Sequence, residues 1–564
     1  MRKKIQILRK KFKDYDIDGY IVPKNDDYFT EYSKINRLKI ISNFSGSAGL
    51  AIILKDKNYL FTDGRYTIQS KIESGKNFEI VSHEKIINCN LFKNLTLGID
   101  PTLITYNQIK KNFLTRNKIK FIKNNLIDEI ESQKIKDDFP FFSLDKNITG
   151  ESYKSKINKI SQYLIKNKSD YLFVSAPENV AWILNIRGGD SPNSPVPNCR
   201  LIISKYKKIF LISNIKKSKK IIKEKIINSN QLINVENFSK KILQLKGKNF
   251  TIDDRSCSIY FENIIKSKFK IIKREDPTYL LKAIKNKTEI KNMINVHILD
   301  GVAVTKFIYW MKKINKKEIN EIQAQEKLEK FRKMNKDYLY PSFDTIAGSG
   351  KNGAIVHYRA KKEDCRTIKK NDIFLCDSGG QYKFGTTDVT RTMCFSKPKL
   401  PVQNIFTKVL KGHIAVVNAN LKKDNTGSKI DKKAREFLKK SKLDYAHGTG
   451  HGVGFFLNVH EGPQSISKIN NVKIREGMIL SNEPGFYKKD SFGIRIENLV
   501  FVKKIRKKIV FENLTLAPIE KELINHRLLS PAEKDYLFKY HINVYSKISK
   551  YLNLNERKWL ASFI

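Results

Sequence analysis

The chain has 564 residues, of which 40% are hydrophobic and 11% aromatic, so it has ample material for packed cores and extensive disorder is excluded. Its length predicts about three or four domains. The 108 Lys+Arg residues against 57 Asp+Glu give a formal net charge of +51, which first suggests an anionic partner such as nucleic acid.

The composition of the basic residues argues against that partner. Lysine outnumbers arginine 89 to 19, and no arm or patch of the sequence concentrates the charge. Arginine binds phosphates and bases through bidentate hydrogen bonds better than lysine does, and arginine is the less frequent of the two in this chain. We therefore expect a solvated basic surface and no specific nucleic-acid partner.

The cysteines and the apolar runs indicate the compartment. The N-terminus is basic but lacks the apolar run of a signal peptide, and no stretch approaches the roughly 18 apolar residues of a membrane span. We expect a cytoplasmic protein without a membrane partner. The six cysteines show no C-x-x-C spacing, which fits a reducing compartment and predicts no cysteine metal site: Cys89, Cys199, Cys257, Cys365, Cys376 and Cys394.

The first half of the chain has the mixed pattern of an α/β protein, without a sequence repeat or a low-complexity block. We place one domain at 1–147 and a second at 148–276. Short apolar runs predict strands at Tyr20–Pro23, Ala51–Leu54, Tyr59–Phe61, Tyr171–Val174 and Leu201–Ile203. The segment Ser191–Asn198 has the composition of a turn-rich loop.

The pattern changes near residue 277, where a third domain, 277–512, is expected to begin. Asn286 and Glu289 have the spacing of a capping box and precede a helical apolar period. After about residue 340 the chain becomes rich in glycine and short strands. A helical extension, 513–564, follows, with Ser530 as N-cap of a helix whose predicted buried face is Leu537, His541, Val544, Ile548 and Leu552. His297 and His541 are interpreted as core or boundary residues.

Four carboxylates lie at the ends of predicted strands in the third domain. Asp377 ends the apolar run Ile373–Asp377, and Asp388 lies in the alternating segment Thr386–Thr392, so a hairpin would bring the two acids side by side. Glu483 and Glu497 repeat the arrangement about a hundred residues later. Histidines lie between the two hairpins, at His447, His451 and His460.

Such a set of acids needs cations. Packed together alone, the carboxylates would repel each other and shift each other's pKa. Two divalent cations remove the repulsion, and with an imidazole the donors suit Mn²⁺, Co²⁺ or Zn²⁺. Two metals roughly 3.5–4 Å apart can hold a bridging hydroxide and polarise a carbonyl, which is machinery for hydrolysis. In this basic chain, the windows 371–382, 448–463 and 479–487 contain no Lys or Arg. That local absence favours a metal site.

Three other motifs are weaker. Gly348, Gly350 and Gly353 match a dinucleotide fingerprint, but residues 354–357 that follow are predicted to form a strand rather than a helix. Cys376 is flanked by apolar residues and is expected to be a packing thiol. Ser378 has no base partner at a recognisable spacing.

At these motifs the sequence resembles the metallopeptidases of the pita-bread fold, which include methionine aminopeptidase, prolidase and aminopeptidase P. It is most similar to aminopeptidase P (Xaa-Pro aminopeptidase) in its long three-domain form, over nearly the whole chain. The segments that carry the resemblance outside the third domain are Phe44–Gly49, Thr62–Tyr66, Ala181–Gly188, Ser194–Val196 and Leu514–Pro518. The resemblance implies two α/β (α+β) amino-terminal, creatinase-like domains, a pita-bread catalytic domain and a helical C-terminal extension.

The resemblance also implies roles for single residues. Asp377 would bind one metal ion and His451 and Glu483 the other, while Asp388 and Glu497 would bridge them. Glu483 would also carry the proton from the bridging water to the departing proline nitrogen. Positions matching the family's substrate-site histidines are His357, His447 and His460, and those matching its second ligand layer are Tyr487 and Arg495. Arg495 would orient the carboxylate of Asp377.

The implied activity is release of the N-terminal residue from peptides with proline at the second position, with two divalent ions per subunit, Mn²⁺ foremost. A homodimer is implied by the long form alone. Two alternatives stay open at this point. One is prolidase, which cleaves only Xaa-Pro dipeptides. The other is a non-catalytic pita-bread protein acting as a chaperone or nucleic-acid binder, although relatives of that kind lose ligands and this chain keeps all five.

Overall fold

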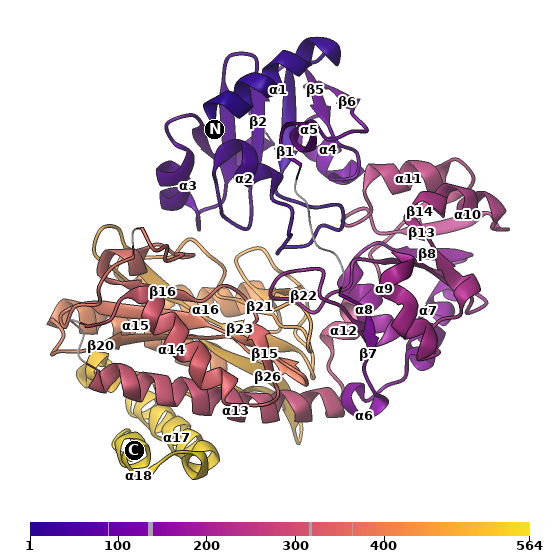
Figure 1. Cartoon of the computed structure of the whole chain (residues 1–564). Coiled ribbons are helices and arrows are strands. Elements are labelled where there is room, and N and C mark those ends of the chain that lie inside the picture. Colours follow the sequence, from indigo (N-terminus) through magenta and orange to yellow (C-terminus); the bar gives the residue numbers. More distant parts are fainter. Residues whose placement is uncertain (88, 115, 133–138, 315–317, 364) are drawn as a thin grey trace. The chain divides into compact units, whose positions relative to one another are not determined.

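The computed structural model describes residues 1–87, 89–114, 116–132, 139–314, 318–363 and 365–564 (Figure 1). The chain divides into two compact units, Met1–Tyr279 and Leu280–Ile564. Both units mix helices and strands, which confirms the predicted α/β class. None of the helices in the described ranges is long and apolar enough to cross a membrane.

The first unit contains two six-stranded sheets with the same topology. The first sheet has the order β4-β3-β2-β1-β5-β6 and the second the order β12-β11-β10-β8-β13-β14. In each order, the second and third pairings are antiparallel and the other three pairings are parallel. The fold is therefore duplicated although the sequence has no detectable repeat. The strands are β1 (Gly19–Pro23), β2 (Leu50–Leu54), β3 (Asn58–Thr62), β4 (Glu79–Ser82), β5 (Thr96–Ile99), β6 (Lys118–Phe121), β8 (Tyr171–Val174), β10 (Arg200–Ser204), β11 (Ile209–Ile212), β12 (Leu232–Ile233), β13 (Asn249–Ile252) and β14 (Lys270–Lys273).

The five strands predicted in this half are confirmed, and the predicted loop at 191–198 contains only an isolated bridge between Ser191 and Ser194. A two-stranded ladder joins β7 (Phe142–Ser143) to β9 (Ile186–Arg187). The helices of the first unit are α1 (Arg2–Asp14), α2 (Arg37–Ser42), α3 (Thr67–Ser74), α4 (Tyr106–Asn112), α5 (Leu126–Ile130), α6 (Lys146–Thr149), α7 (Tyr153–Lys166), α8 (Pro177–Leu184), α9 (Ile215–Lys223), α10 (Phe238–Gln244) and α11 (Ile259–Lys266), while α12 (Thr278–Ala283) joins the units.

The second unit is built on two helix pairs and a C-terminal helical extension. The packed pairs are α13 (Lys287–Lys313) with α14 (Glu321–Lys333), and α15 (Leu400–Val417) with α16 (Gly427–Lys439); the extension contains α17 (Pro531–Ile548) and α18 (Leu554–Ala561). The capping boxes predicted at Asn286 and Ser530 are both formed. The helix after Ser530 ends at Ile548, so Leu552, predicted on its buried face, is buried just beyond it.

Short strands fill the centre of this unit. They form three-stranded sheets β15-β18-β19 and β16-β17-β20, the five-stranded sheet β22-β21-β23-β26-β27 and the hairpin β24-β25. Their bounds are β15 (Tyr338–Pro341), β16 (Ile346–Ser349), β17 (Ile373–Ser378), β18 (Gly380–Tyr382), β19 (Gly385–Thr386), β20 (Val389–Cys394), β21 (Gly450–Gly452), β22 (Glu461–Ile466), β23 (Ile479–Asn482), β24 (Gly485–Lys488), β25 (Phe492–Arg495), β26 (Asn498–Ile505) and β27 (Lys508–Asn513).

Two local predictions in this unit need correction. The strand predicted at 354–357 is wrong: Gly350–Ala354 forms the 3₁₀ helix η5 and a turn follows. The continuous strand predicted at Thr386–Thr392 is broken at residues 387–388. The break arises because β19 pairs with β18 in one sheet and β20 pairs with β17 in another, so the chain changes sheets between them.

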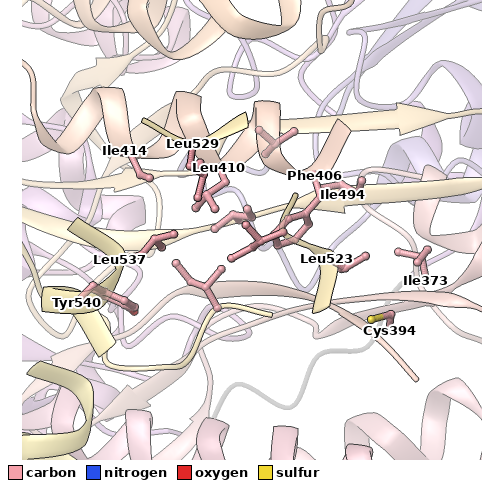
Figure 2. Packing of buried hydrophobic residues seen from close by; sticks show 14 of the residues in the cluster. Ile373, Cys394, Phe406, Leu410, Ile414, Ile494, Leu523, Leu529, Leu537 and Tyr540 are labelled. Atoms are coloured by element: carbon pink, nitrogen blue, oxygen red, sulfur yellow. The ribbon is translucent and has the colours of Figure 1, made fainter. Parts of the chain in front are cut away.

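The core of the second unit joins the C-terminal extension to the strands. Buried Phe406, Leu410 and Ile414 of α15 pack with Ile494 of β25 and with residues of α17 that include Tyr540 (Figure 2). Because the extension supplies apolar side chains to this cluster, its burial contributes to the stability of the whole unit.

Candidate active site

Asp377 and Asp388 lie together because β17 and β20 are antiparallel partners. The register pairs Asp377 with Thr390 and Ser378 with Val389, so Asp388 is the residue immediately before the paired region. Both carboxylates are buried, with 8% and 4% exposure. The predicted adjacency of these strands is confirmed, although a detour through β18 and β19 separates them in the chain.

Glu483 and Glu497 occupy the gap between two consecutive hairpin pairings. The β23–β26 ladder ends with Asn482 opposite Asn498, and the β24–β25 ladder begins with Gly485 opposite Arg495. Each glutamate therefore lies where one ladder stops and the next starts. The backbone N–H of Glu497 donates to the carbonyl oxygen of Thr390 at 3.1 Å, which connects this opening to β20.

His451, on β21, lies among these acids. Its Nε2 is 3.5 Å from Asp388 Oδ2 and 3.5 Å from Glu483 Oε1. Asp388, His451 and Glu497 each offer a donor atom, and these atoms all lie within 4.8 Å of one another. A glycine precedes His451 because a Cβ on Gly450 would lie 2.0 Å from the carbonyl oxygen of Ser481 on the neighbouring strand.

The pKa values at this cluster reflect crowded negative charge. Burial and the nearby carboxylate of Asp377 raise the pKa of Asp388 to about 6, against the opposing effect of His451. Burial and the surrounding acids also raise the pKa of Glu497 well above its usual range. Burial alone would lower the pKa of His451, but Asp388 and Glu483 outweigh it and raise that pKa to about 9.

The donor set fits divalent cations. Asp377 Oδ1 and Asp388 Oδ1 are buried side-chain oxygens that have no hydrogen-bond partner in the part of the chain that the structure describes. Leaving a carboxylate oxygen buried and unsatisfied is costly, so native structures pair such atoms with a donor or an ion. A cation bound between these oxygens would satisfy both atoms and screen the repulsion that raises the pKa of Asp388 and Glu497.

A buried chain of hydrogen bonds connects the cluster to His447. Arg495 Nη2 donates to Asp377 Oδ2 at 2.6 Å, and Arg495 Nη1 donates to Tyr487 Oη at 2.5 Å. Tyr487 Oη is in turn 2.9 Å from His447 Nε2. Burial raises the pKa of Tyr487 to about 12, so its hydroxyl stays protonated near neutral pH. The residues predicted as second-layer positions therefore link one acid to one histidine.

The two remaining histidines of the predicted set have different surroundings. The ring of His460 lies 4.3 Å from that of His451, centroid to centroid, in an edge-to-face arrangement. His357 lies in the turn after η5. The backbone of η5 approaches β25 so closely that a Cβ on Gly493 would lie 1.8 Å from the carbonyl oxygen of Gly353. His357 is thus positioned by a segment that packs on the strand carrying Arg495.

Several side chains that orient these groups were not predicted from the sequence. Thr390 Oγ1 donates to Glu497 Oε2 at 2.8 Å and accepts from Arg495 Nε at 3.1 Å. Ser481 Oγ donates to Glu483 Oε1 at 3.0 Å and accepts from the backbone N–H of His451 at 2.9 Å. The sequence carried no local signal for Thr390, because its partner Glu497 lies 107 residues away in the chain.

A buried ion cluster supports the segment next to His460. Glu461 lies 2.6 Å from Lys285 Nζ and 3.1 Å from Lys282 Nζ, and all three side chains are 1% exposed. Lys282 lies in the last turn of α12, and Lys285 lies in the short segment that joins α12 to α13. Glu461 was not singled out from the sequence because both of its partners lie about 180 residues away in the chain.

Two histidines and one cysteine that were predicted to be packing residues are buried, as expected. His297 Nδ1 hydrogen-bonds the carbonyl oxygen of Met293 at 2.7 Å, and His541 Nε2 accepts from the backbone N–H of Ile519 at 3.2 Å. Burial lowers the pKa of His541 to about 4 and raises that of the Cys376 thiol to about 12. His541 is therefore neutral near pH 7, and the thiol is a poor nucleophile.

Comparisons with known protein families match most of the chain. A model of metallopeptidase family M24 matches residues 291–504, and one of the C-terminal region of the same peptidases matches residues 508–562. Models of the creatinase/prolidase N-terminal domain match residues 4–124 and 132–289.

Individual proteins match over the full length. A probable Xaa-Pro aminopeptidase P of Laccaria bicolor is 36% identical, covering 98% of this chain and 91% of its own length. Xaa-Pro aminopeptidase 1 of Dictyostelium discoideum is 37% identical over 100% and 96% of the two chains. The crystal structure of an X-prolyl aminopeptidase of Caenorhabditis elegans, described as a cytosolic enzyme with a di-nuclear active site, superposes with a TM-score of 0.91 at 28% identity, covering 100% and 99% of the chains.

Proposed function

We propose that this chain, which belongs to metallopeptidase family M24 and over its whole length to the Xaa-Pro aminopeptidases within it, hydrolyses the bond between an N-terminal residue and a following proline. The predicted pita-bread architecture with two creatinase-like domains is confirmed by the four family matches and the worm structure. The observation that carries the activity is the cluster of Asp388, His451 and Glu497 beside the two unsatisfied oxygens of Asp377 and Asp388.

The enzyme uses two metal ions, as the di-nuclear site of the worm relative indicates. In our proposal, Asp377 would hold one ion, His451 and Glu483 would hold the other, and Asp388 and Glu497 would serve both. When bound, the two ions would supply Lewis acidity and lower the pKa of a hydrolytic water. The oxygen-rich donor set with a single imidazole favours Mn²⁺, and Co²⁺ and Zn²⁺ suit the same donors.

The residues around this cluster have separate tasks in the reaction. Glu483 is held by Ser481 with Oε2 3.9 Å from His447 Nδ1, a position from which it can accept a proton and return it to the proline nitrogen that leaves. His447, His357 and His460 contact the peptide and the developing tetrahedral centre. Arg495 and Tyr487 keep Asp377 and His447 in fixed orientations.

Substrate choice follows from the amide that must be cleaved. An Xaa-Pro bond is a tertiary amide without an N–H, so a site built for it cannot use a hydrogen bond from that nitrogen. It must instead accept the pyrrolidine ring. The ring of His447 packs at a tilt against Tyr445, with ring centroids 4.9 Å apart, and edge-to-face against Tyr487, with centroids 5.4 Å apart, so it offers a rigid wall for the pyrrolidine ring.

A peptide panel tests the proposal. Full-length chain is stripped with chelator, reloaded with Mn²⁺, Co²⁺ or Zn²⁺, and given Xaa-Pro-Yaa tripeptides and Xaa-Pro dipeptides. We expect metal-dependent release of free Xaa from tripeptides. Preference for the dipeptides would assign prolidase instead. A metal-loaded chain that cleaves none of the peptides would overturn the proposal and favour a non-catalytic pita-bread protein.

Several coarser expectations remain proposals of the same kind. We propose domain boundaries after residues 147, 276 and 512, near the limits of the four family matches. We also propose a cytoplasmic homodimer without a specific nucleic-acid or membrane partner. Gel filtration with light scattering tests the dimer, and cell fractionation tests the compartment.

A further inference from the structure

Arg391 is a buried cation whose hydrogen-bond acceptors, within the described ranges, are all neutral groups. It lies on β20, is 3% exposed, and forms no ion pair with a carboxylate among the residues that the structure describes. The five N–H groups of its guanidinium lie within hydrogen-bond distance of six acceptors, the two N–H groups of Nη2 being shared among three of them: Thr390 O at 2.8 Å, Glu497 O at 2.6 Å, Asn498 Oδ1 at 2.8 Å, Ala517 O at 2.9 Å, Pro518 O at 3.0 Å and Tyr540 Oη at 3.0 Å. A charge without an ionic partner is costly to bury, so its contacts have to be numerous and well directed.

These partners fall into two groups that are far apart in the chain. Thr390 lies on β20, Asn498 on β26, and Glu497 directly before β26, all around the carboxylate cluster. Ala517, Pro518 and Tyr540 belong to the C-terminal extension, and Tyr540 is 149 residues from Arg391. The planar guanidinium therefore joins the extension to the backbone on which one of the proposed metal-bridging carboxylates is carried.

These contacts orient both the backbone and the side chain of Glu497. Arg391 holds the carbonyl oxygen of Glu497 itself, while Thr390, whose own carbonyl oxygen Arg391 also holds, donates from Oγ1 to Glu497 Oε2 at 2.8 Å. The backbone and the carboxylate of Glu497 are thus oriented through the same pair of neighbouring residues. Loss of the guanidinium fork would release both.

We propose that Arg391 is a positioning residue for Glu497, and that the C-terminal extension, acting through Tyr540, is a structural part of the metal-binding site. This inference rests on the proposed function, since it takes Glu497 to be a metal ligand. It assigns the extension a specific task beyond packing: to hold Arg391 in the rotamer that orients this carboxylate.

Removing the positive charge of Arg391 and removing its directed hydrogen bonds should have opposite effects on metal affinity. A fixed positive charge near a metal site repels the cations, so removing the charge alone would strengthen metal binding. Removing the directed hydrogen bonds would weaken binding, because the ligand is no longer preorganised. The substitution Arg391→Lys keeps the charge and removes the planar fork, so it isolates positioning.

Two tyrosines of α17 provide a matched pair of variants. Tyr536 and Tyr540 stack with ring centroids 6.3 Å apart. Tyr540 Oη accepts from Arg391 and donates to Ala517 O at 2.8 Å, whereas Tyr536 Oη accepts from Asn513 Nδ2 at 3.0 Å. Tyr540→Phe therefore removes a hydroxyl that contacts Arg391, and Tyr536→Phe removes one that does not.

The experiment measures metal affinity on chelator-treated, full-length chain, by titration with Co²⁺ followed in the visible absorption spectrum and with Mn²⁺ by calorimetry. We expect metal affinity to fall about tenfold or more in Arg391→Lys and a few-fold in Tyr540→Phe, with altered Co²⁺ absorption in both, and no change in Tyr536→Phe. Thermal unfolding of each metal-free variant shows whether it is folded.

The outcomes separate this inference from the proposed function. If wild-type chain binds neither metal, the proposed function fails first. If wild type binds and Tyr540→Phe binds equally well with an unchanged spectrum, the positioning role is overturned. It is also overturned if Tyr536→Phe loses as much affinity as Tyr540→Phe, since the effect then reflects packing. Should Arg391→Lys fail to fold, the tyrosine pair still decides.

Discussion

The substitution Arg495→Lys gives a quantitative test of how the proposed site is oriented. Arg495 is 2% exposed and donates to three different groups: Asp377 Oδ2 at 2.6 Å, Tyr487 Oη at 2.5 Å and Thr390 Oγ1 at 3.1 Å. Lysine keeps the positive charge, but its single ammonium cannot reach three acceptors arranged around a planar fork. We expect it to retain the contact with Asp377 and lose the other two.

The magnitude follows from the lost hydrogen bonds. Each is worth about 0.5–1.5 kcal/mol, so the pair corresponds to about 1–3 kcal/mol. If that energy serves to hold Asp377 and His447 for the reaction, kcat/KM should fall about 5- to 150-fold. The loss should appear mainly in kcat, because the lost contacts orient groups that act on the scissile bond rather than the rest of the peptide.

The control is the same substitution at another buried arginine. Arg37, in the first unit, is 6% exposed and donates to Asp128 from Nε at 2.8 Å and from Nη2 at 2.7 Å. Arg37→Lys should lower the midpoint of thermal unfolding as Arg495→Lys does, yet leave kcat/KM and Mn²⁺ affinity within about twofold. If Arg495→Lys also keeps both within twofold, or if Arg37→Lys loses activity equally, the orienting role is refuted.

Three further predictions concern stability and charge. Asp388→Asn should make the metal-free chain more resistant to thermal unfolding than metal-free wild type, because it removes a buried charge whose pKa is raised by burial and Asp377. The same substitution should abolish the stabilisation by added Mn²⁺. Equal metal-induced shifts of the unfolding midpoint in both proteins would contradict this prediction. Burial lowers the pKa of His541 to about 4, so the neutral ring contributes stability above the unfolded pKa near 6.5, and this stability is lost as the pH falls towards 4. In urea unfolding, the free energy of unfolding of His541→Gln should therefore fall by about 2 kcal/mol less than that of wild type between pH 7 and pH 5. Glu461→Gln leaves two buried ammonium groups without their carboxylate and should lower the free energy of unfolding in urea by about 3–5 kcal/mol. Glu512→Gln, at a half-exposed ion pair, should lower it by under about 1 kcal/mol. Similar values for the two variants would contradict a special role of the buried cluster.

Much of the candidate site could be read from short stretches of sequence. The acids at 377, 388, 483 and 497 each follow or precede an apolar or β-branched run, and the ends of paired strands lie together whatever the rest of the chain does. The helix starts at Asn286 and Ser530 were equally readable, since a capping box involves residues only three positions apart.

Other features depended on segments that the sequence does not relate to each other. The broken strand at 387–388 could not be predicted, because the pairing of β19 with β18 decides where the chain changes sheets. The duplicated topology of the two six-stranded sheets was likewise hidden, since strand order and direction can be kept by many different apolar residues.

The sequence by itself determined which side chains we propose for the chemistry and where many of the local elements start and stop. Those properties depend on residue type and on neighbours within a few positions. Only the tertiary structure decided which residues orient those side chains, such as Thr390 for Glu497 and Tyr540 for Arg391. The reason is physical: a hydrogen bond between residues more than a hundred positions apart depends on how whole elements pack, and close packing leaves no periodic or compositional trace in the sequence.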